Sequence, residues 1–173
     1  MYVEELKIPK ERIAVFIGRK GETKRSLERR TKTKIRVSKE GDVQIMAEES
    51  FNTFIATPVV KAIGRGFNPD IAALLTRENM HLEIIDLRDF AKDSKAKLQR
   101  IRARLIGTEG KAWKMIEKLT NTHLAVHGRT AAIIGKVDEV HIVRQAIEKL
   151  LGGSPHSNVY RFIESQLHIL HQQ

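Results

Sequence analysis

The chain of 173 residues contains no cysteine. It therefore has no disulfide framework, no thiolate zinc site and no cysteine nucleophile. No apolar run approaches the roughly 20 residues that cross a bilayer, and the N-terminal MYVEELKIPK lacks the basic and then apolar order of a signal peptide. Aromatic residues make up 5% of the chain, which is few for a protein that binds bases by stacking. We expect a cytoplasmic protein that binds no membrane.

Positive charge, by contrast, is plentiful and lies in two stretches. The formal net charge is +10. Residues 10–39 carry twelve Lys or Arg against three Glu, and residues 95–129 carry nine against two. Between them, residues 40–94 hold ten acidic residues against five Lys or Arg. This distribution indicates a polyanionic partner and two copies of the part that binds it.

An internal repeat accounts for the two basic stretches. Shifting the chain by 89 residues aligns IGRKGETKRSLERRTKTKIRV, residues 17–37, with IGTEGKAWKMIEKLTNTHLAV, residues 106–126. Seven aligned positions are identical, among them both glycines of a GxxG motif. Self-similarity at a fixed offset indicates a duplicated structural unit.

Both copies predict the same order of elements. Alternating apolar residues predict strands over 3–8 and 80–87. In each copy one helix ends at the first glycine of the GxxG motif, and a second helix follows the motif. Hairpins over 34–47 and 123–135 come next, and a third helix closes each copy, over 137–151 in the second.

Two further helices are predicted outside the repeat, near 69–77 and 157–170. Asn68 is the expected N-cap of the first, with a proline in its first turn. Pro58 falls within the third helix of the first copy, so a kink or a late start is expected there.

The GxxG motif has a physical use beyond turning the chain. Its glycines let a ligand backbone approach closely, and it precedes a helix N-terminus that attracts phosphate. A single GxxG is most often only a turn between helices. Two copies in the same context, each within a basic stretch, favour a phosphate-binding role.

With these elements on both sides of each GxxG, the chain resembles the KH family of single-stranded RNA-binding domains, in the type I order. The resemblance implies an α+β fold of two tandem type I KH domains, β-α-α-β-β-α, each a three-stranded antiparallel sheet with helices on one face. The expected parts are a first KH domain over 1–67, an interdomain helix or linker over 68–78, and a second KH domain with a C-terminal helix over 79–173.

In KH domains the GxxG loop clamps the backbone of about four nucleotides. The resemblance therefore implies RNA contacts at the glycines Gly18, Gly21, Gly107 and Gly110, at the loop residues Arg19, Lys20, Thr108 and Glu109, and at the basic residues Lys24, Arg25, Arg36, Arg104, Lys111 and Lys114.

Some positions depart from the usual KH pattern or allow two interpretations. Lys24 and Trp113 stand where an aliphatic residue commonly follows the loop, and Glu109 places a negative charge beside the expected phosphate path. Ile35 and Val37 are either the apolar floor of the RNA groove or simply core. The second helix of the first copy has few apolar residues, so its packing should be weaker.

A narrower resemblance rests on VVKAIGRGFNPDIAALL (59–75), RIRARLIGTEGKAWKMIEKLT (100–120) and GSPHSNVYRFIE (153–164). These segments are similar to the double-KH ribosome-assembly factors known as the partner of Nob one family. The resemblance implies a non-enzymatic protein that binds the 3′ region of small-subunit rRNA or its precursor, and partners among pre-rRNA nucleases, methylases or translation factors. The alternative is a protein-interaction adaptor in which one KH unit is a docking surface for a ribosome-assembly or translation factor.

Signs of catalysis or metal binding are weak. No Ser/His/Asp or paired-carboxylate spacing supports a reaction, and no nucleotide-binding glycine motif is complete. His123 and His127 share a strand face but lie far apart. We expect no catalytic residue, no metal site and no cofactor; an enzyme acting on a small phosphorylated ligand is the least favoured reading.

Overall fold

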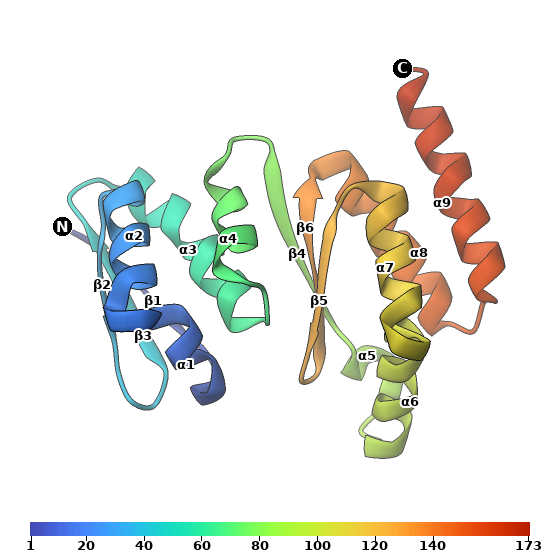
Figure 1. The fold of residues 1–173 in the computed structure, drawn as a ribbon, viewed down its shortest axis with the longest axis horizontal. Helices are drawn as coiled ribbons and strands as arrows, with labels where there is room; N and C mark the ends of the chain where they lie inside the picture. Colours follow the sequence, from blue (N-terminus) through green and yellow to red (C-terminus); the bar gives the residue numbers. More distant parts are fainter. The chain divides into compact units, whose positions relative to one another are not determined.

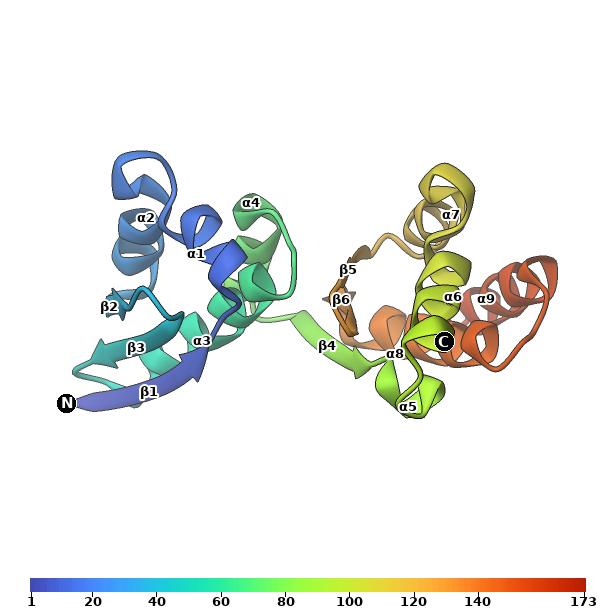
Figure 2. The same ribbon diagram turned by 90° about the horizontal axis from the view of Figure 1, so that it is seen from below.

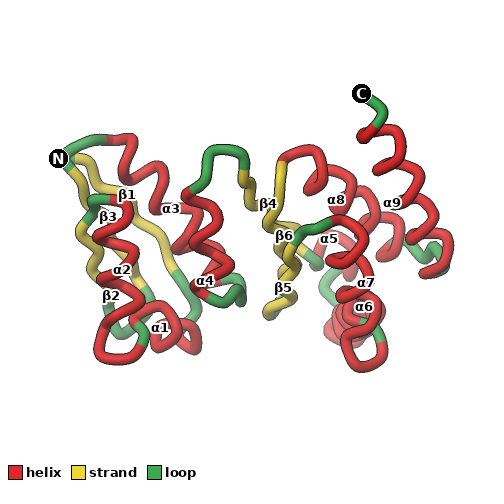
Figure 3. Tube along the Cα trace, turned by 45° about the horizontal axis from the view of Figure 1, so that its top comes forward, coloured by secondary structure: helices red, strands yellow, loops and turns green.

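The structure is a computed structural model that describes all 173 residues, and the chain divides into two units, Met1–Met80 and His81–Gln173 (Figure 1). Unit 1 contains an antiparallel sheet of β1 (Tyr2–Lys7), β3 (Asp42–Ala47) and β2 (Lys34–Val37), in the order β1-β3-β2. Unit 2 repeats this order with β4 (Met80–Asp86), β6 (Thr130–Lys136) and β5 (His123–His127). In each unit the helices cover one face of the strands (Figure 3). The predicted α+β class with two KH-type sheets is confirmed.

The helices follow the predicted order in both units (Figure 2). Unit 1 contains α1 (Lys10–Ile17), the 3-10 turn η1 (Arg19–Gly21), α2 (Glu22–Thr31), α3 (Ser50–Gly64), α4 (Pro69–Ala72) and the 3-10 turn η2 (Ala73–Thr76). Unit 2 contains α5 (Arg88–Ala91), α6 (Lys95–Ile106), the 3-10 turn η3 (Thr108–Gly110), α7 (Lys111–Thr120), α8 (Val137–Leu151) and α9 (His156–His171).

Alternation along the strands builds the core of unit 1. Val43, Ile45 and Ala47 of β3 point toward the helices and are buried, as the two-residue period of a strand requires. Ile35 of β2 pairs with Ile45 and is also buried. In unit 2 the core gathers residues from β4, β6 and α5 to α9, and its fully buried members include Leu87, Ile116, Ile133, Ile147 and Ile163.

In both units an arginine of the helix before the GxxG binds the end of the third helix. Arg12 donates to the carbonyls of Ile63 and Phe67, both at 2.8 Å. Arg104 donates to the carbonyls of Leu150 at 2.9 Å and Ser154. The last carbonyls of a helix lack intrahelical donors. Each guanidinium therefore adds side-chain donors there, beside the backbone bonds that Gly66 and Gly153 donate to the carbonyls of Ile63 and Leu150. Burial lowers the pKa of Arg12 from its usual value.

Local predictions can be compared with these elements. The helix expected over 137–151 is α8, and the one near 157–170 is α9. Asn68 caps α4 by accepting a hydrogen bond from the Asp70 N–H at 2.8 Å. Of the kink or late start expected at Pro58, the late start is wrong, because α3 begins at Ser50 and runs through the proline. Both α4 and η2 pack against α3, within unit 1.

Candidate nucleic-acid interface

The two GxxG turns have the same backbone conformation. We call residues 18–21 the GRKG turn and residues 107–110 the GTEG turn. Gly18 and Gly107 have φ of 75° and 77°. Lys20 and Glu109 are left-handed, with φ of 54° and 56°. In each turn the last glycine N–H donates to the first glycine carbonyl at 3.1 Å.

The conformation leaves two amide groups per turn for a ligand. The N–H groups of Gly18 and Gly21 are bonded within the turn or to α1, and the N–H of Glu22 donates to the Arg19 carbonyl. The N–H groups of Arg19 and Lys20 join none of the backbone hydrogen bonds of the unit. A non-glycine residue in the left-handed region costs about 1–2 kcal/mol, and such strain is typical of ligand-binding turns.

The first glycine of each turn is required by packing. A Cβ on Gly18 would lie 2.1 Å from Thr23 Oγ1, and one on Gly107 would lie 2.7 Å from Ala112 Cβ. The second glycine faces open space apart from one long basic side chain. A Cβ on Gly110 would meet only Lys114, at 3.6 Å. The second glycine therefore keeps the outer side of the turn accessible.

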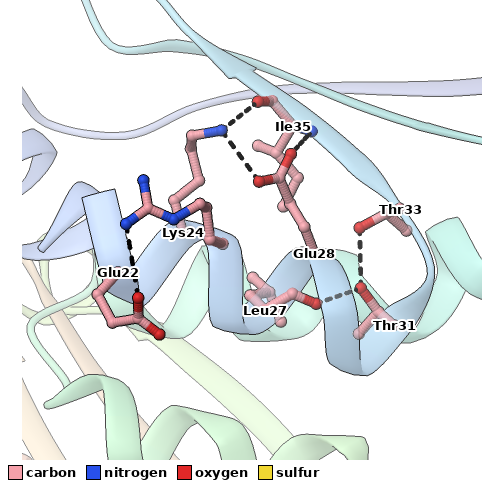
Figure 4. A network of polar contacts seen from close by, with 8 residues as sticks. Glu22, Lys24, Leu27, Glu28, Thr31, Thr33 and Ile35 are labelled. Atoms are coloured by element: carbon pink, nitrogen blue, oxygen red, sulfur yellow. Dashed lines mark hydrogen bonds and ion pairs between the residues drawn. The ribbon is translucent and has the colours of Figure 1, made fainter. Parts of the chain in front are cut away.

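Behind the turn, α2 is joined to the free edge of β2 by a polar network (Figure 4). Glu28 accepts the N–H of Ile35 at 2.9 Å, and Lys24 Nζ donates to the Ile35 carbonyl at 3.0 Å and to Glu28 at 3.1 Å. The Thr31 hydroxyl donates to the Leu27 carbonyl at 2.7 Å and lies 2.8 Å from the hydroxyl of Thr33. The network satisfies both backbone groups of Ile35 at an edge that β3 does not pair.

Unit 2 repeats most of this network. Glu117 accepts the N–H of Leu124 at 2.8 Å, and the hydroxyls of Thr120 and Thr122 lie 2.7 Å apart. The exception is the position of Lys24, which Trp113 occupies in unit 2. Trp113 packs against the core and supplies no donor of this kind. The two units therefore share a backbone arrangement but present different chemistry beside the edge strand.

Most of the predicted loop residues are gathered around the turns. Arg19, Lys20, Thr108 and Glu109 are exposed at the tips. Arg25 and Lys114, which are equivalent in the repeat, both lie beside the second glycine of their turn. Lys111 is exposed at the start of α7.

Glu22, at the start of α2, is the acidic residue nearest to the GRKG turn in the sequence. It accepts a hydrogen bond from Arg29 at 2.9 Å and pairs with Arg25 at 3.5 Å. The bond from Arg29 lowers the pKa of Glu22. Glu22 therefore offsets part of the positive charge on α2, whereas Arg19 and Lys20 remain unpaired.

Three predicted contacts occupy other positions. Lys24 was expected at phosphate, but its ammonium is committed to Glu28 and Ile35. Arg104 was also expected there, but its guanidinium binds carbonyls at the end of α8. Arg36 lies on the outer face of the sheet, beside Gln44 of β3, away from the helices. Ile35 is core, whereas Val37 is only partly buried.

Sequence reasoning missed the structural role of Glu28, Glu117 and the paired threonines. These residues form three of the seven identities between the two copies: Glu28 with Glu117, Thr31 with Thr120, and Thr33 with Thr122. Their repetition was the signal, because polar residues kept in both copies have the same hydrogen-bond partners in both units.

Other kinds of site find no support in the structure. No group of three or more His, Asp or Glu side chains is arranged to hold a metal ion. None of the helices has the length and apolar character needed to span a membrane.

Comparison with known proteins gives the family. Residues 81–168 match the model of the second KH domain of PNO1, a eukaryotic type KH-domain (KH-domain type I), and residues 3–54 match the general KH domain. A KH domain-containing protein of Methanocaldococcus jannaschii is 39% identical over 95% of this chain and 74% of its own. The pre-rRNA-processing protein pno1 of Aspergillus fumigatus is 32% identical over 58% of this chain, which spans 41% of that protein.

Solved structures agree with these relatives. The crystal structure of Dim2p from Pyrococcus horikoshii is 44% identical, with a TM-score of 0.89 over 95% of this chain and 99% of that one. A chain in the complex of a/eIF2alpha, aDim2p and rRNA from the same organism matches with a TM-score of 0.88 and 44% identity, over 95% and 93% of the two chains. The chain therefore belongs to the PNO1/Dim2 family of proteins with two KH domains.

Proposed function

We propose that this chain is a non-enzymatic protein that binds single-stranded RNA through both GxxG turns, and that its RNA is the 3′ region of small-subunit rRNA or its precursor. The observation that carries the proposal is the matched pair of turns. Each has a left-handed residue at its third position, unbonded amide groups at its tip and a basic side chain beside its last glycine. The rRNA-bound complex of a relative supports the choice of RNA.

The geometry divides the work of binding between backbone and side chains. Amide groups at the tips can donate to phosphate oxygens without any sequence preference. The edge of β5 beside Trp113 and the edge of β2 beside Lys24 differ in polarity, so the two units should favour different bases. Positive charge at Arg19 and Lys20 makes the GRKG turn the stronger electrostatic contact, and Glu109 makes the GTEG turn the weaker one.

The test is a fluorescence titration with single-stranded oligonucleotides from the 3′ end of small-subunit rRNA and with scrambled versions of them. We expect tighter binding to the natural sequence, and a loss of affinity when Arg19 and Lys20 are replaced by Asp. A second variant places Asp at Thr108 and at Glu109. If neither variant changes affinity, or if scrambled RNA binds equally well, the proposal is wrong.

A second function, as an adaptor for a protein of ribosome assembly or translation, is supported by a different observation. The relative in the rRNA complex is bound together with a/eIF2alpha. Unit 1 also carries exposed apolar side chains outside the GxxG region. Binding of purified translation initiation factor subunit alpha, measured with and without RNA, tests this function. Binding that requires RNA would contradict a separate protein-binding surface.

A further inference from the structure

Exposed apolar side chains gather at one edge of unit 1. Tyr2, Val3, Phe51 and Phe54 are 53%, 49%, 63% and 75% exposed, respectively. They line one groove of about 620 Å³ between β1 and α3, together with Pro58. Two phenylalanines on adjacent turns of α3 so far out of the core are unusual, since aromatic side chains normally contribute large buried areas. We call this surface the β1–α3 groove.

The backbone beside the groove is also unpaired. Strand β1 lies at the edge of the sheet, with β3 on its other side only. The Ile8 N–H donates to the Gly41 carbonyl at 2.9 Å, and inward and outward groups alternate along an antiparallel strand. The alternation leaves the N–H and C=O groups of Val3, Glu5 and Lys7 pointing away from β3. An edge with apolar neighbours is a template for an added strand.

The charges around the groove identify the kind of partner. Four exposed acidic residues, Glu4, Glu5, Glu48 and Glu49, lie on β1 and just before α3, against Lys7 on β1 and Lys61 on α3. This acidic rim on a protein of net charge +10 repels phosphate and makes the groove unsuited to RNA.

The same acidic residues disfavour a second copy of this chain. In a two-fold antiparallel pairing of β1 with the β1 of a second copy, the centre of the pairing can lie at Glu4, at Glu5 or between them. Each of these registers places carboxylates opposite each other. Like charges directly opposite destabilise a sheet. The complement of an acidic edge is a basic strand.

From these observations we infer that the β1–α3 groove docks an extended segment of a partner protein in which apolar side chains alternate with Lys or Arg. The segment adds a strand to β1. Its apolar side chains lie on Phe51 and Phe54, on the helix-facing side of the sheet, and its basic side chains lie on the opposite side, where Glu5 points. The inference is independent of the RNA-binding turns, and it gives the adaptor function a location and a ligand chemistry.

The probe is a labelled seven-residue peptide of alternating Lys and Val, titrated into the full chain and followed by fluorescence anisotropy. Two control peptides are used: one of the same composition with its valines consecutive, and one with Glu in place of Lys. We expect the alternating Lys peptide to bind at least tenfold more tightly than either. Peptide binding should also slow amide hydrogen exchange at Val3, Glu5 and Lys7, which exchange rapidly in the free chain.

Matched variants localise the binding. Because Phe51 and Phe54 are exposed, replacing both by Ser should leave the fold intact and weaken the peptide at least tenfold. The control replaces Val137 and Ile169, which are 59% and 51% exposed on unit 2, by Ser and should leave affinity unchanged. Replacing Glu4 and Glu5 by Lys should reverse the preference toward the Glu peptide.

Several outcomes would overturn the inference. These are equal binding by the Phe51 and Phe54 variant, equal binding of the three peptides, or protection of the β1 amides in the free chain. Displacement of the peptide by single-stranded RNA would make the groove an RNA site and would also overturn it. The RNA titration is repeated on the same variants, so loss of RNA binding and loss of peptide binding are told apart.

Discussion

Replacing Arg19 and Lys20 by Ala removes two exposed, unpaired cations from the tip of the GRKG turn. The turn should keep its shape, because its conformation depends on Gly18 and Gly21 and because neither side chain makes a hydrogen bond or ion pair. Lys20 is already in the left-handed region, with φ of 54°. The left-handed conformation costs alanine about the same free energy as lysine. The melting temperature of the double variant should therefore not change.

The size of the effect follows from counterion release. For single-stranded nucleic acid, the logarithm of the binding constant falls with the logarithm of salt by about 0.7 for each phosphate that is neutralised. If each side chain contacts one phosphate, the double variant should show a slope flatter by about 1.4. Between 50 and 200 mM salt, the variant should therefore lose about sevenfold less affinity than the original protein.

The assay is anisotropy of a labelled rRNA oligonucleotide at four or more salt concentrations. The matched control replaces Lys61 and Lys136, which are exposed and distant in sequence from both turns, by Ala. It removes the same charge and should leave the slope unchanged. An unaltered slope in the Arg19 and Lys20 variant would refute phosphate contact at this turn. An equal flattening in the control would show that only total charge matters.

Four further substitutions test the structural roles assigned to residues of unit 2. Gly107→Ala should lower the free energy of unfolding by about 3 kcal/mol, because φ is 77° and the new Cβ would lie 2.7 Å from the backbone of α7; Gly110→Ala adds only the backbone cost of about 1–2 kcal/mol, and urea unfolding ranks the two. Arg104→Ala removes the side-chain donor from the Ser154 carbonyl and one of the donors to the Leu150 carbonyl, which also accepts from the Gly153 N–H; this costs about 1–3 kcal/mol and should speed amide exchange in α9, and unchanged exchange would contradict the role of this arginine. A hydrogen bond from Arg88 holds the pKa of Asp86 at about 2, below its usual 3.8, so Arg88→Ala should raise that pKa in a carbon-13 titration. Since the depressed pKa adds stability above pH 3.8 that is lost as pH falls toward 2, the variant should lose less stability over that range.

The sequence was sufficient for features that depend on local pattern. Glycines three residues apart predicted both turns, and the apolar spacing of residues 137–151 predicted α8 with its observed bounds. The Asn68 cap was also predictable, because the capping bond spans only two residues. Pro58 misled the prediction for α3, since the tertiary packing of Val59, Val60 and Ile63 holds the helix through the proline.

Side-chain direction across the fold was not predictable. Arg104 reaches carbonyls 46 and 50 residues away, and Arg12 reaches carbonyls 51 and 55 residues away. A basic residue before a GxxG has the same local pattern whether it points to phosphate or to the end of a packed helix. The direction of Lys24 was not predictable either. Its ammonium reaches the Ile35 carbonyl only because β2 runs beside α2, and the sequence around Lys24 does not show the path of β2.

The β1–α3 groove was missed for a related reason. Phe51 and Phe54 are large aromatic residues, which normally contribute buried area to a core. Their exposure follows from the face of α3 that they occupy, since Ala56, Val60 and Ile63 on the other face of the helix are the ones buried. The acidic residues that give the groove its chemistry come from two segments, 4–5 and 48–49, which only the pairing of β1 with β3 brings together.

The residues that are identical in the two copies stabilise each KH unit, and the residues that differ lie where a ligand would bind. Glycine, glutamate and threonine recur because Gly18 and Gly107 pack against the following helix, and because the glutamates and threonines join that helix to the edge strand. The positions that differ are the tips of the turns and the site of Lys24, which is Trp113 in unit 2. A duplicated unit that keeps the glycine packing and the glutamate and threonine contacts, and changes the turn tips and the position of Lys24, can bind two different stretches of one RNA. Substitutions at the turn tips, at Lys24 or at Trp113 should therefore change the base preference of one unit only. Substitutions of the shared glutamates and threonines should instead unfold the unit that carries them.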